Sequence, residues 1–260
     1  MKKKPKLTIK NLVHSFSREN NRPLRVINNI SLEVKEGEIV SLIGPSGCGK
    51  TTVFNIVSGI LPKQTGIITV DGVKESSRQG KFGYMFQESL LFPWRTVLKN
   101  VMLGYEIKGI EKPLAKTQAL SLLKQFGLLD YAHLYPNTLS GGMKQKVSLL
   151  RTIAFNSSFL LLDEPFGSLD AITRSELHLY LLEIWKKLKL TIMLTTHDIR
   201  EAVFLSDRVY ILSKKPSQII DCLLITLPRP RKLEDLTSEK FIYLEKKLMN
   251  LLKQSHILSS

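Results

Sequence analysis

The chain has 260 residues, 43% hydrophobic content and a formal net charge of +15. This length and composition allow one substantial core, or one core with a smaller appended subdomain. The apolar runs are far shorter than the roughly 20 residues that cross a bilayer, and no apolar signal segment follows the basic start. We therefore expect a cytoplasmic protein that is neither a channel nor a carrier.

The two cysteines indicate a reducing compartment. Cys48 lies in a glycine-rich loop, where a disulfide with Cys222 would obstruct a ligand. The positive charge favours nucleic acid or an anionic membrane surface as a neighbour. A solvated lysine-rich face explains the same charge equally well.

Short strand-like runs alternate with helical ones, which predicts a layered α/β domain. Helical patterns around Val97–Tyr105 and Pro113–Phe126 interrupt the strands and indicate an inserted helical subdomain. A tail over Ser238–Gln254 has apolar residues at helical spacing. We expect it to pack on its own domain, with docking on another subunit as the alternative. The expected strands are Leu7–Val13, Ile30–Val34, Ile39–Ile43, Ile67–Val70, Phe82–Phe86, Phe159–Leu162, Thr191–Thr195 and Val209–Leu212.

A phosphate-binding P-loop follows the third of these strands and opens a helical segment over Thr52–Ser58. Its glycines let backbone N–H groups turn toward a polyphosphate, and the helix N-terminus adds a positive dipole. Lys50 is expected to reach the β- and γ-phosphates, and the Thr51 hydroxyl to hold Mg²⁺. The loop residues are Gly44, Pro45, Ser46, Gly47, Cys48, Gly49, Lys50 and Thr51.

Two further motifs carry candidate catalytic groups. The apolar run Phe159–Leu162 ends in Asp163 and Glu164, at the strand edge where nucleotides bind in open α/β sheets. Asp163 is expected to coordinate Mg²⁺, and Glu164 to polarise the attacking water. The run from Leu139 to Gln145 opens a helix with a serine and two glycines, a second phosphate-binding element. Since one P-loop already binds one nucleotide, this element is expected to contact the ATP of another copy.

These motifs, in this order, resemble the ATP-binding cassette (ABC) family of transport ATPases from Leu7 to about Arg231. The resemblance implies a P-loop NTPase fold with a RecA-like core, an N-terminal antiparallel β subdomain and a helical subdomain at about 96–155. Residues 232–260 then form a separate helical tail. By the same resemblance, ATP contacts fall on Phe16, on Gly44 to Thr51 with Thr52, and on Ser140, Gly141, Gly142 and Gln145.

Three single residues have simpler alternative explanations. Gln87 could be a polar strand end, but the resemblance makes it a Mg²⁺ and water ligand. His197 could cap the helix near Asp198, but in this context it is the histidine that contacts the γ-phosphate. Phe16 is either the aromatic that stacks on adenine or a core residue. The stretch Ser17–Leu24 makes its alignment uncertain.

The resemblance also implies partners. Two cassettes face each other head to tail, a second ATP-binding subunit completes each site, and a homodimer is the simplest assembly. Phe92 and Trp94 suit a groove for a short helix of a transmembrane permease, or else they anchor the helical subdomain. With Ser213–Ile219 and Pro228–Arg231, this segment is similar to importers of nitrate, sulfonate, taurine and bicarbonate. Importers of vitamin precursors share much of it.

We therefore expect the ATPase subunit of an importer, on the inner face of the membrane, with a separate solute-binding protein. A cassette ATPase acting on nucleic acid is the main alternative, although such proteins are usually tandem or split by coiled coils. The ATPase of an exporter is another. Departures from the family pattern, Lys144, Lys146, Ser157 and Phe16, remove no catalytic group.

Overall fold

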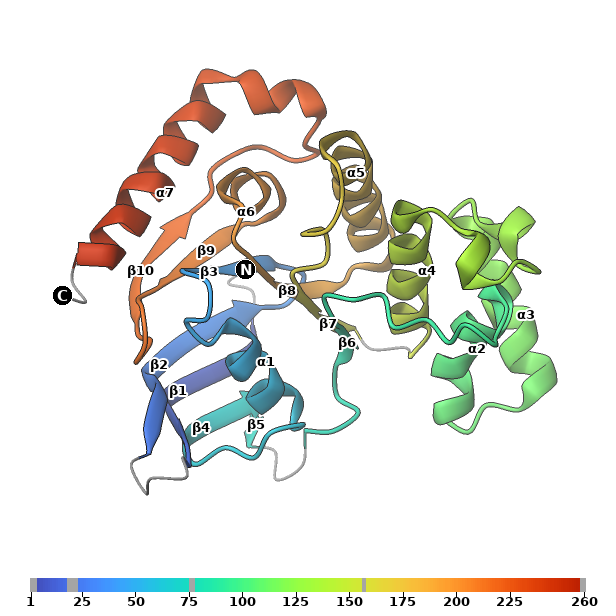
Figure 1. Cartoon of the computed structure of the whole chain (residues 1–260), viewed down its shortest axis with the longest axis horizontal. Coiled ribbons are helices and arrows are strands. Elements are labelled where there is room, and N and C mark those ends of the chain that lie inside the picture. Colours follow the sequence, from blue (N-terminus) through green and yellow to red (C-terminus); the bar gives the residue numbers. More distant parts are fainter. Residues whose placement is uncertain (1–3, 18–22, 75–77, 156–157, 258–260) are drawn as a thin grey trace. The chain divides into compact units, whose positions relative to one another are not determined.

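The computed structural model describes residues 4–17, 23–74, 78–155 and 158–257, and these form two compact units (Figure 1). The first unit contains the chain up to Gly80 and from Leu190 onward, and the second contains Lys81–Lys189. The start of the chain, the middle of Ser17–Leu24, Ser157 and the last three tail residues lie outside the described residues.

An antiparallel sheet opens the first unit, as the sequence predicts. Its strands are β1 (Pro5–Phe16), β2 (Leu24–Lys35), β4 (Thr65–Val70) and β5 (Val73–Lys74), in the order β2-β1-β4-β5. β1 is longer than the expected Leu7–Val13 because irregularities in its register let it continue. One lies between Ile9 and Leu12, where Asn11 takes a positive φ of 50°. Such a bulge inserts one residue while the pairing resumes on either side.

The second sheet of this unit has the order β10-β9-β3-β8. β3 (Ile39–Ile43) runs parallel to β8 (Thr191–Thr196) and to β9 (Arg208–Leu212). β3 and β8 are buried along their whole length, which matches parallel strands covered on both faces. β10 (Ile219–Leu224) pairs antiparallel with β9, and the apolar pattern does not predict it because much of it is exposed.

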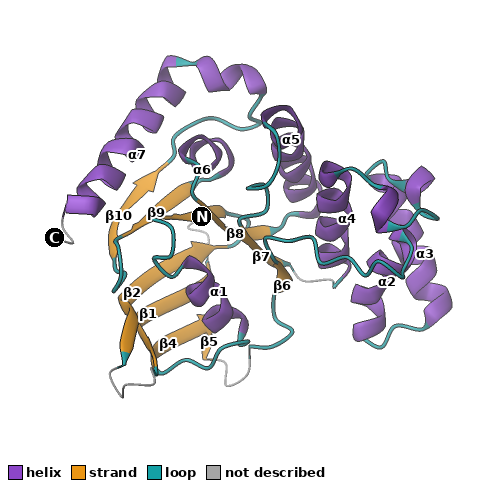
Figure 2. Ribbon diagram, viewed as in Figure 1, coloured by secondary structure: helices purple, strands orange, loops and turns teal. Residues whose placement is uncertain are grey.

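In the described part of the first unit, three α-helices accompany the two sheets: α1 (Lys50–Ser58), α6 (Ile199–Leu205) and α7 (Glu239–Ile257) (Figure 2). A short 3-10 helix, Leu233–Thr237, precedes α7. Phe241, Leu244 and Leu248 of α7 are buried, and α7 contacts α6, β9 and β10. The guanidinium group of Arg200 on α6 lies 5.4 Å from the centre of the Phe241 ring. The tail thus packs on its own unit, as its apolar spacing predicts.

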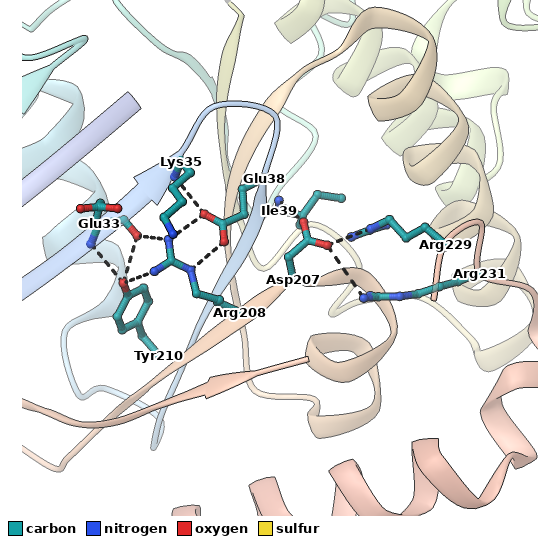
Figure 3. A network of polar contacts seen from close by, with 9 residues as sticks. All are labelled: Glu33, Lys35, Glu38, Ile39, Asp207, Arg208, Tyr210, Arg229 and Arg231. Carbon is teal, nitrogen blue, oxygen red and sulfur yellow. Dashed lines mark hydrogen bonds and ion pairs between the residues drawn. The ribbon is translucent and has the colours of Figure 1, made fainter. Parts of the chain in front are cut away.

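A polar network links β2 to the second sheet (Figure 3). Arg208 donates two hydrogen bonds to Glu38, of 2.6 and 2.7 Å, and a third to the Glu33 carbonyl at 2.9 Å. The Tyr210 hydroxyl bonds both the N–H and the carbonyl of Glu33. This network connects β2 to β9, and losing one partner of its largely buried charge pair would be costly.

Asp207 connects the same region to the segment after β10 (Figure 3). One carboxylate oxygen accepts from the Ile39 N–H at 2.8 Å, and the other from Arg229 at 2.9 Å. Arg229 also donates to the Leu205 carbonyl, and Arg231 to the Phe204 carbonyl, both at 2.7 Å. These arginines bind carbonyl groups at the end of α6, where cations are favoured.

The second unit pairs two short parallel strands, β6 (Gly83–Met85) and β7 (Phe159–Asp163), with four α-helices among its described residues. α2 (Val97–Ile107), α3 (Lys112–Gln125) and α4 (Gly141–Ala154) contact one another within this unit. Two 3-10 turns, Leu129–Tyr131 and Pro136–Thr138, connect α3 to α4. α5 (Ala171–Leu188) is not predicted, because its apolar residues lie on both faces: Leu177 is buried while Ile172 is exposed.

Gly104 of α2 lies close against the C-terminal end of α4. A Cβ atom at this position would lie 2.4 Å from the Phe155 backbone nitrogen. We expect Gly104→Ala to lower the free energy of unfolding by about 1–3 kcal/mol, since overpacking outweighs the gain in helix propensity. Urea denaturation measures this, with Ser121→Ala on exposed α3 surface as the control. Unchanged stability of Gly104→Ala would contradict the close approach.

Candidate functional site

The P-loop connects the buried end of β3 to the start of α1. Gly47 and Gly49 have φ values of +72° and +110°, which L side chains rarely adopt. Gly49 is the N-cap of α1, and its carbonyl accepts the Val53 N–H at 2.9 Å. Gly47 has open space around its Cα, and Ser46 is exposed. The loop is therefore a turn of backbone N–H groups at a helix N-terminus, an arrangement that binds phosphate.

Lys50 directs its ammonium group back over this loop. Its Nζ donates to the Gly44 carbonyl at 3.1 Å and to the Pro45 carbonyl at 3.4 Å, and the residue is 6% exposed. A positive charge in so enclosed a position favours an anionic ligand. The neighbouring Thr51 is exposed, and Thr52 is half-buried.

The Cys48 side chain fills the space beneath the loop. The residue is 2% exposed, and a Cβ on Gly44 would lie 3.1 Å from its sulfur. Burial raises the pKa of the Cys48 thiol despite the nearby Lys50. Both cysteines are free thiols. Cys48 therefore serves as packing for the loop.

Two residues that sequence motifs do not identify form the base of the P-loop. A Cβ on Gly49 would lie 2.9 Å from Val26 of β2 and 3.5 Å from the Ser217 hydroxyl. Ser217 is fully buried and donates both its N–H and its hydroxyl to the Val26 carbonyl, at 2.9 and 3.1 Å. The only sequence signal was the stretch Ser213–Ile219, which contains Ser217 but assigns it no role.

The sheet register places His197 beside the P-loop. Ile43, the last residue of β3, pairs with Thr196, the last residue of β8. Gly44 and His197 follow these two residues, so both begin at the same sheet edge. His197 is exposed, and Asp198, not His197, caps α6 by accepting the N–H groups of Arg200 and Glu201. The capping alternative for His197 is therefore wrong.

Phe16 ends β1, where it pairs with Leu24. It is 40% exposed, which is unlike a core residue, and its ring meets His14 edge-on at 4.8 Å. Val26, which contacts Gly49, lies two residues beyond Leu24. Phe16 thus stands at the end of the strand pair nearest the P-loop base, available to stack on a planar ligand.

Asp163 is the last residue of β7 in the second unit, and Glu164 follows it. Asp163 is 6% exposed, and the Tyr84 hydroxyl of β6 lies 3.5 Å from its Oδ2. Burial, and then the Asp163 charge, raise the pKa of Tyr84, so this phenol stays protonated. Glu164 takes a left-handed φ of 45° just before Pro165. Such a backbone costs about 1–3 kcal/mol and is concentrated at functional sites.

The run Leu139–Gln145 opens α4 as expected. Ser140 is the N-cap, and its hydroxyl accepts the Met143 N–H at 3.3 Å. Ser140 and Gly141 are exposed, whereas a Cβ on Gly142 would lie 2.4 Å from the Thr173 side chain of α5. The open serine and helix N-terminus can contact a phosphate, while Gly142 lets α4 approach α5.

Asp170 is the N-cap of α5. Its carboxylate accepts the N–H groups of Thr173 and Ile172 at 3.0 and 3.1 Å. The hydrogen bond from Thr173 lowers the pKa of Asp170 most. Asp170 thus begins the helix whose Thr173 lies against Gly142 at the α4 N-terminus.

Gln87 is exposed just after β6, while Gln145 is buried. The Gln145 amide nitrogen donates to the Gln87 carbonyl of the same chain at 3.2 Å. Gln145 is expected from sequence to contact nucleotide; in this structure its amide nitrogen contacts the loop that carries Gln87.

Comparison with known proteins agrees with these motifs. A family profile described as ABC transporter matches residues 27–167. An uncharacterized ABC transporter ATP-binding protein of Methanocaldococcus jannaschii is 44% identical over 250 residues, covering 96% of this chain and 92% of that protein.

The chain belongs to the ABC transporter family.

Two further similarities concern the assembly and the role. A taurine import ATP-binding protein of Yersinia pestis is 41% identical, covering 76% of this chain and 77% of that protein. A solved ATP-binding cassette, described as a dimer in a post-hydrolysis state bound to ADP and phosphate, is 28% identical with a TM-score of 0.74. The structural match covers 85% of this chain and 100% of the solved cassette. The expected cassette fold and ATP hydrolysis are thereby confirmed. No helix in the described part of this ABC protein is long and apolar enough to span a membrane.

The two thiols provide a test of the P-loop packing. We expect N-ethylmaleimide to modify exposed Cys222 on the order of tenfold faster than buried Cys48 in the native protein, since thiol reactivity follows access and thiolate fraction. Mass spectrometry after timed labelling distinguishes them, and unfolding in guanidinium should equalise the two. A Cys222→Ser variant that still labels rapidly would show that Cys48 is accessible.

Proposed function

We propose that this ABC protein is the ATP-hydrolysing subunit of an importer that drives uptake of a small solute through a separate membrane permease. The observation that carries the proposal is the P-loop with Lys50 held over it and His197 beginning at the same sheet edge. The names of the relatives, such as taurine import ATP-binding protein, support import as the direction. A solute-binding protein and a position on the inner face of the membrane belong to the same proposal.

The metal in this proposal is Mg²⁺, held by Thr51, Gln87 and Asp163. Hydroxyl, amide and carboxylate oxygens are the hard ligands that Mg²⁺ prefers, and it commonly uses few protein ligands together with substrate phosphates. Among the described residues no group of three or more His, Cys, Asp or Glu could hold a metal. When bound, Mg²⁺ neutralises phosphate charge.

The side chains then divide the work of hydrolysis. Lys50 binds the β- and γ-phosphates as a point charge. Glu164 polarises the attacking water, and its left-handed backbone is consistent with a position set by function. His197 contacts the γ-phosphate, and Phe16 stacks on adenine.

We further propose that two copies form the active assembly. Exposed Ser140 and Gly141 at the α4 N-terminus would contact the ATP held by the P-loop of the second copy. The similarity to a dimeric cassette supports this arrangement. A C₂ homodimer is the simplest assembly because each copy then gives and receives the same contact.

A groove in the second unit is our candidate for the permease contact. It has a volume of about 360 Å³, and its lining is mostly apolar, with Phe86, Leu90, Phe92, Leu103, Ile107 and Phe155 among its residues. Phe92 stacks on Trp94 with ring centres 5.1 Å apart, and Trp94 is 72% exposed. An aromatic that anchored the subdomain would be buried, so Trp94 fits a docking surface better. A short amphipathic helix is the partner that such grooves take.

The alternatives have less support. The charge of +15 is the one feature that favours nucleic acid, and strong salt-dependent DNA binding would be its signature. No observation on this chain favours an exporter, whereas the relatives carry import names.

Glu164→Gln tests the catalytic assignment. The variant should bind MgATP, lose about 10²- to 10⁴-fold in turnover, and accumulate as an ATP-bound dimer, because only the water-polarising carboxylate is lost. Phosphate release and light scattering measure turnover and dimerisation. Glu176→Gln, on exposed α5 surface, is the matched control. Parental turnover of Glu164→Gln would remove Glu164 from the mechanism.

Ile107→Glu tests the groove. Ile107 is 64% exposed and lines the groove, so a carboxylate there should reduce the permease that co-purifies with the tagged chain by at least about tenfold. Leu114→Glu, on α3 outside the groove lining and 53% exposed, controls for added charge on an apolar surface position. Equal recovery with both variants would place the permease contact elsewhere.

A further inference from the structure

Polar side chains on one side of helix α4 contact the segment after β6. Gln145, Ser148 and Arg151 are three residues apart, so they share one face of the helix. Gln145 donates to the Gln87 carbonyl at 3.2 Å, and Ser148 donates to the Ser89 carbonyl at 3.0 Å. Arg151 donates to the carbonyls of Ser89 and Leu90 at 2.7 and 2.6 Å. Four hydrogen bonds from one helix therefore hold three backbone carbonyls of a four-residue segment.

The Arg151 bonds hold backbone that is unfavourable by itself. Leu90 has a φ of 44°, in the left-handed region that a bulky side chain rarely adopts. Its carbonyl is one of the two that Arg151 binds. A planar guanidinium reaches two neighbouring carbonyls at once, and the single ammonium of lysine cannot reproduce that fork.

The following segment is attached separately. Asn100 of α2 is fully buried and accepts the Phe92 N–H at 2.8 Å. Its amide nitrogen donates to the carbonyls of Phe92, Arg95 and Thr96, at 3.1, 2.9 and 3.1 Å. The chain from Gln87 onward is thus bound first to α4 and then to α2.

The same helix presents Ser140 at its N-terminus and Arg151 at the groove, whose lining also includes Leu90. We propose that Gln145, Ser148 and Arg151 are positioning residues that lock the Gln87–Leu90 segment to α4, so that Gln87 and Ser140 move as one body. This inference rests on the proposed function. It adds that binding at the groove or at Gln87 changes the position of Ser140 through α4. Ser140 in turn contacts the second copy's ATP.

The first test is ATP-driven dimerisation in the Glu164→Gln background. Arg151→Met should raise the ATP concentration at half-dimerisation by about 5- to 150-fold, the usual range of coupling between sites. Arg151→Lys should show most of this loss, because it keeps the charge without the fork. The Mg²⁺ concentration at half-saturation should rise in parallel, since the Gln87 segment is no longer held to α4. Lys116→Met, which removes an exposed cation from α3, is the control.

A second measurement needs no nucleotide. Hydrogen exchange followed by mass spectrometry should show that Arg151→Met increases exchange both at 86–92 and at 140–145, although Ser140 lies eleven residues from the substitution. Ser148→Ala should give a smaller change at the same two places, and it serves if Arg151→Met fails to fold.

The outcomes separate the two levels of the argument. If Arg151→Met increases exchange at 86–92 but not at 140–145, the lock is overturned. It is also overturned if Arg151→Met lowers the melting temperature but dimerises like Lys116→Met, and Arg151 is then a structural residue. If Glu164→Gln neither binds ATP nor dimerises, the proposed function fails, and the exchange experiment still decides whether the segment and the helix move together.

Discussion

Polyphosphate binding by backbone N–H groups requires a turn that does not move, and the first unit is organised around that constraint. β3 enters the P-loop fully buried, and α1 leaves it with Gly49 as cap. Val26 and Ser217 close the base from two other strand regions. Because the turn is immobilised from three sides, its N–H groups can be arranged before ligand arrives, so little ordering entropy remains to oppose binding.

The same constraint extends outward. β8 runs parallel to β3, so its end carries His197 to the P-loop edge, and α6 then leads the chain away. Arg229 and Arg231 bind carbonyls at the far end of α6, and α7 covers it. In the second unit, α4 has Ser140 at its N-terminus and binds the loop after β6 through side chains further along the helix. Each of these site residues therefore lies at one end of an element, and contacts at the other end hold that element in place.

Much of this was predictable from sequence, and the residues show why. The P-loop follows from its glycines, two of which take positive φ values that L side chains rarely adopt, and the buried strands follow from continuous apolar runs. α5 and β10 were not predictable, because Ile172 is exposed on the helix and Asp221 and Cys222 are exposed on the strand. Contacts to backbone carbonyls were also hidden. A carbonyl is the same at every residue, so neither the Arg151 contacts nor the base at Ser217 leaves a pattern to read.

The helix α7 has a consequence for any shortened form of this protein. The family profile ends at residue 167, and the cassette resemblance ends near Arg231. A chain cut at Arg231 would retain every catalytic motif but lose Phe241, Leu244 and Leu248, which are now buried in contact with the first unit. The bared apolar surface on α6, β9 and β10 would promote self-association. Aggregation of such a fragment would then reflect its missing cover and reveal nothing about nucleotide-driven pairing.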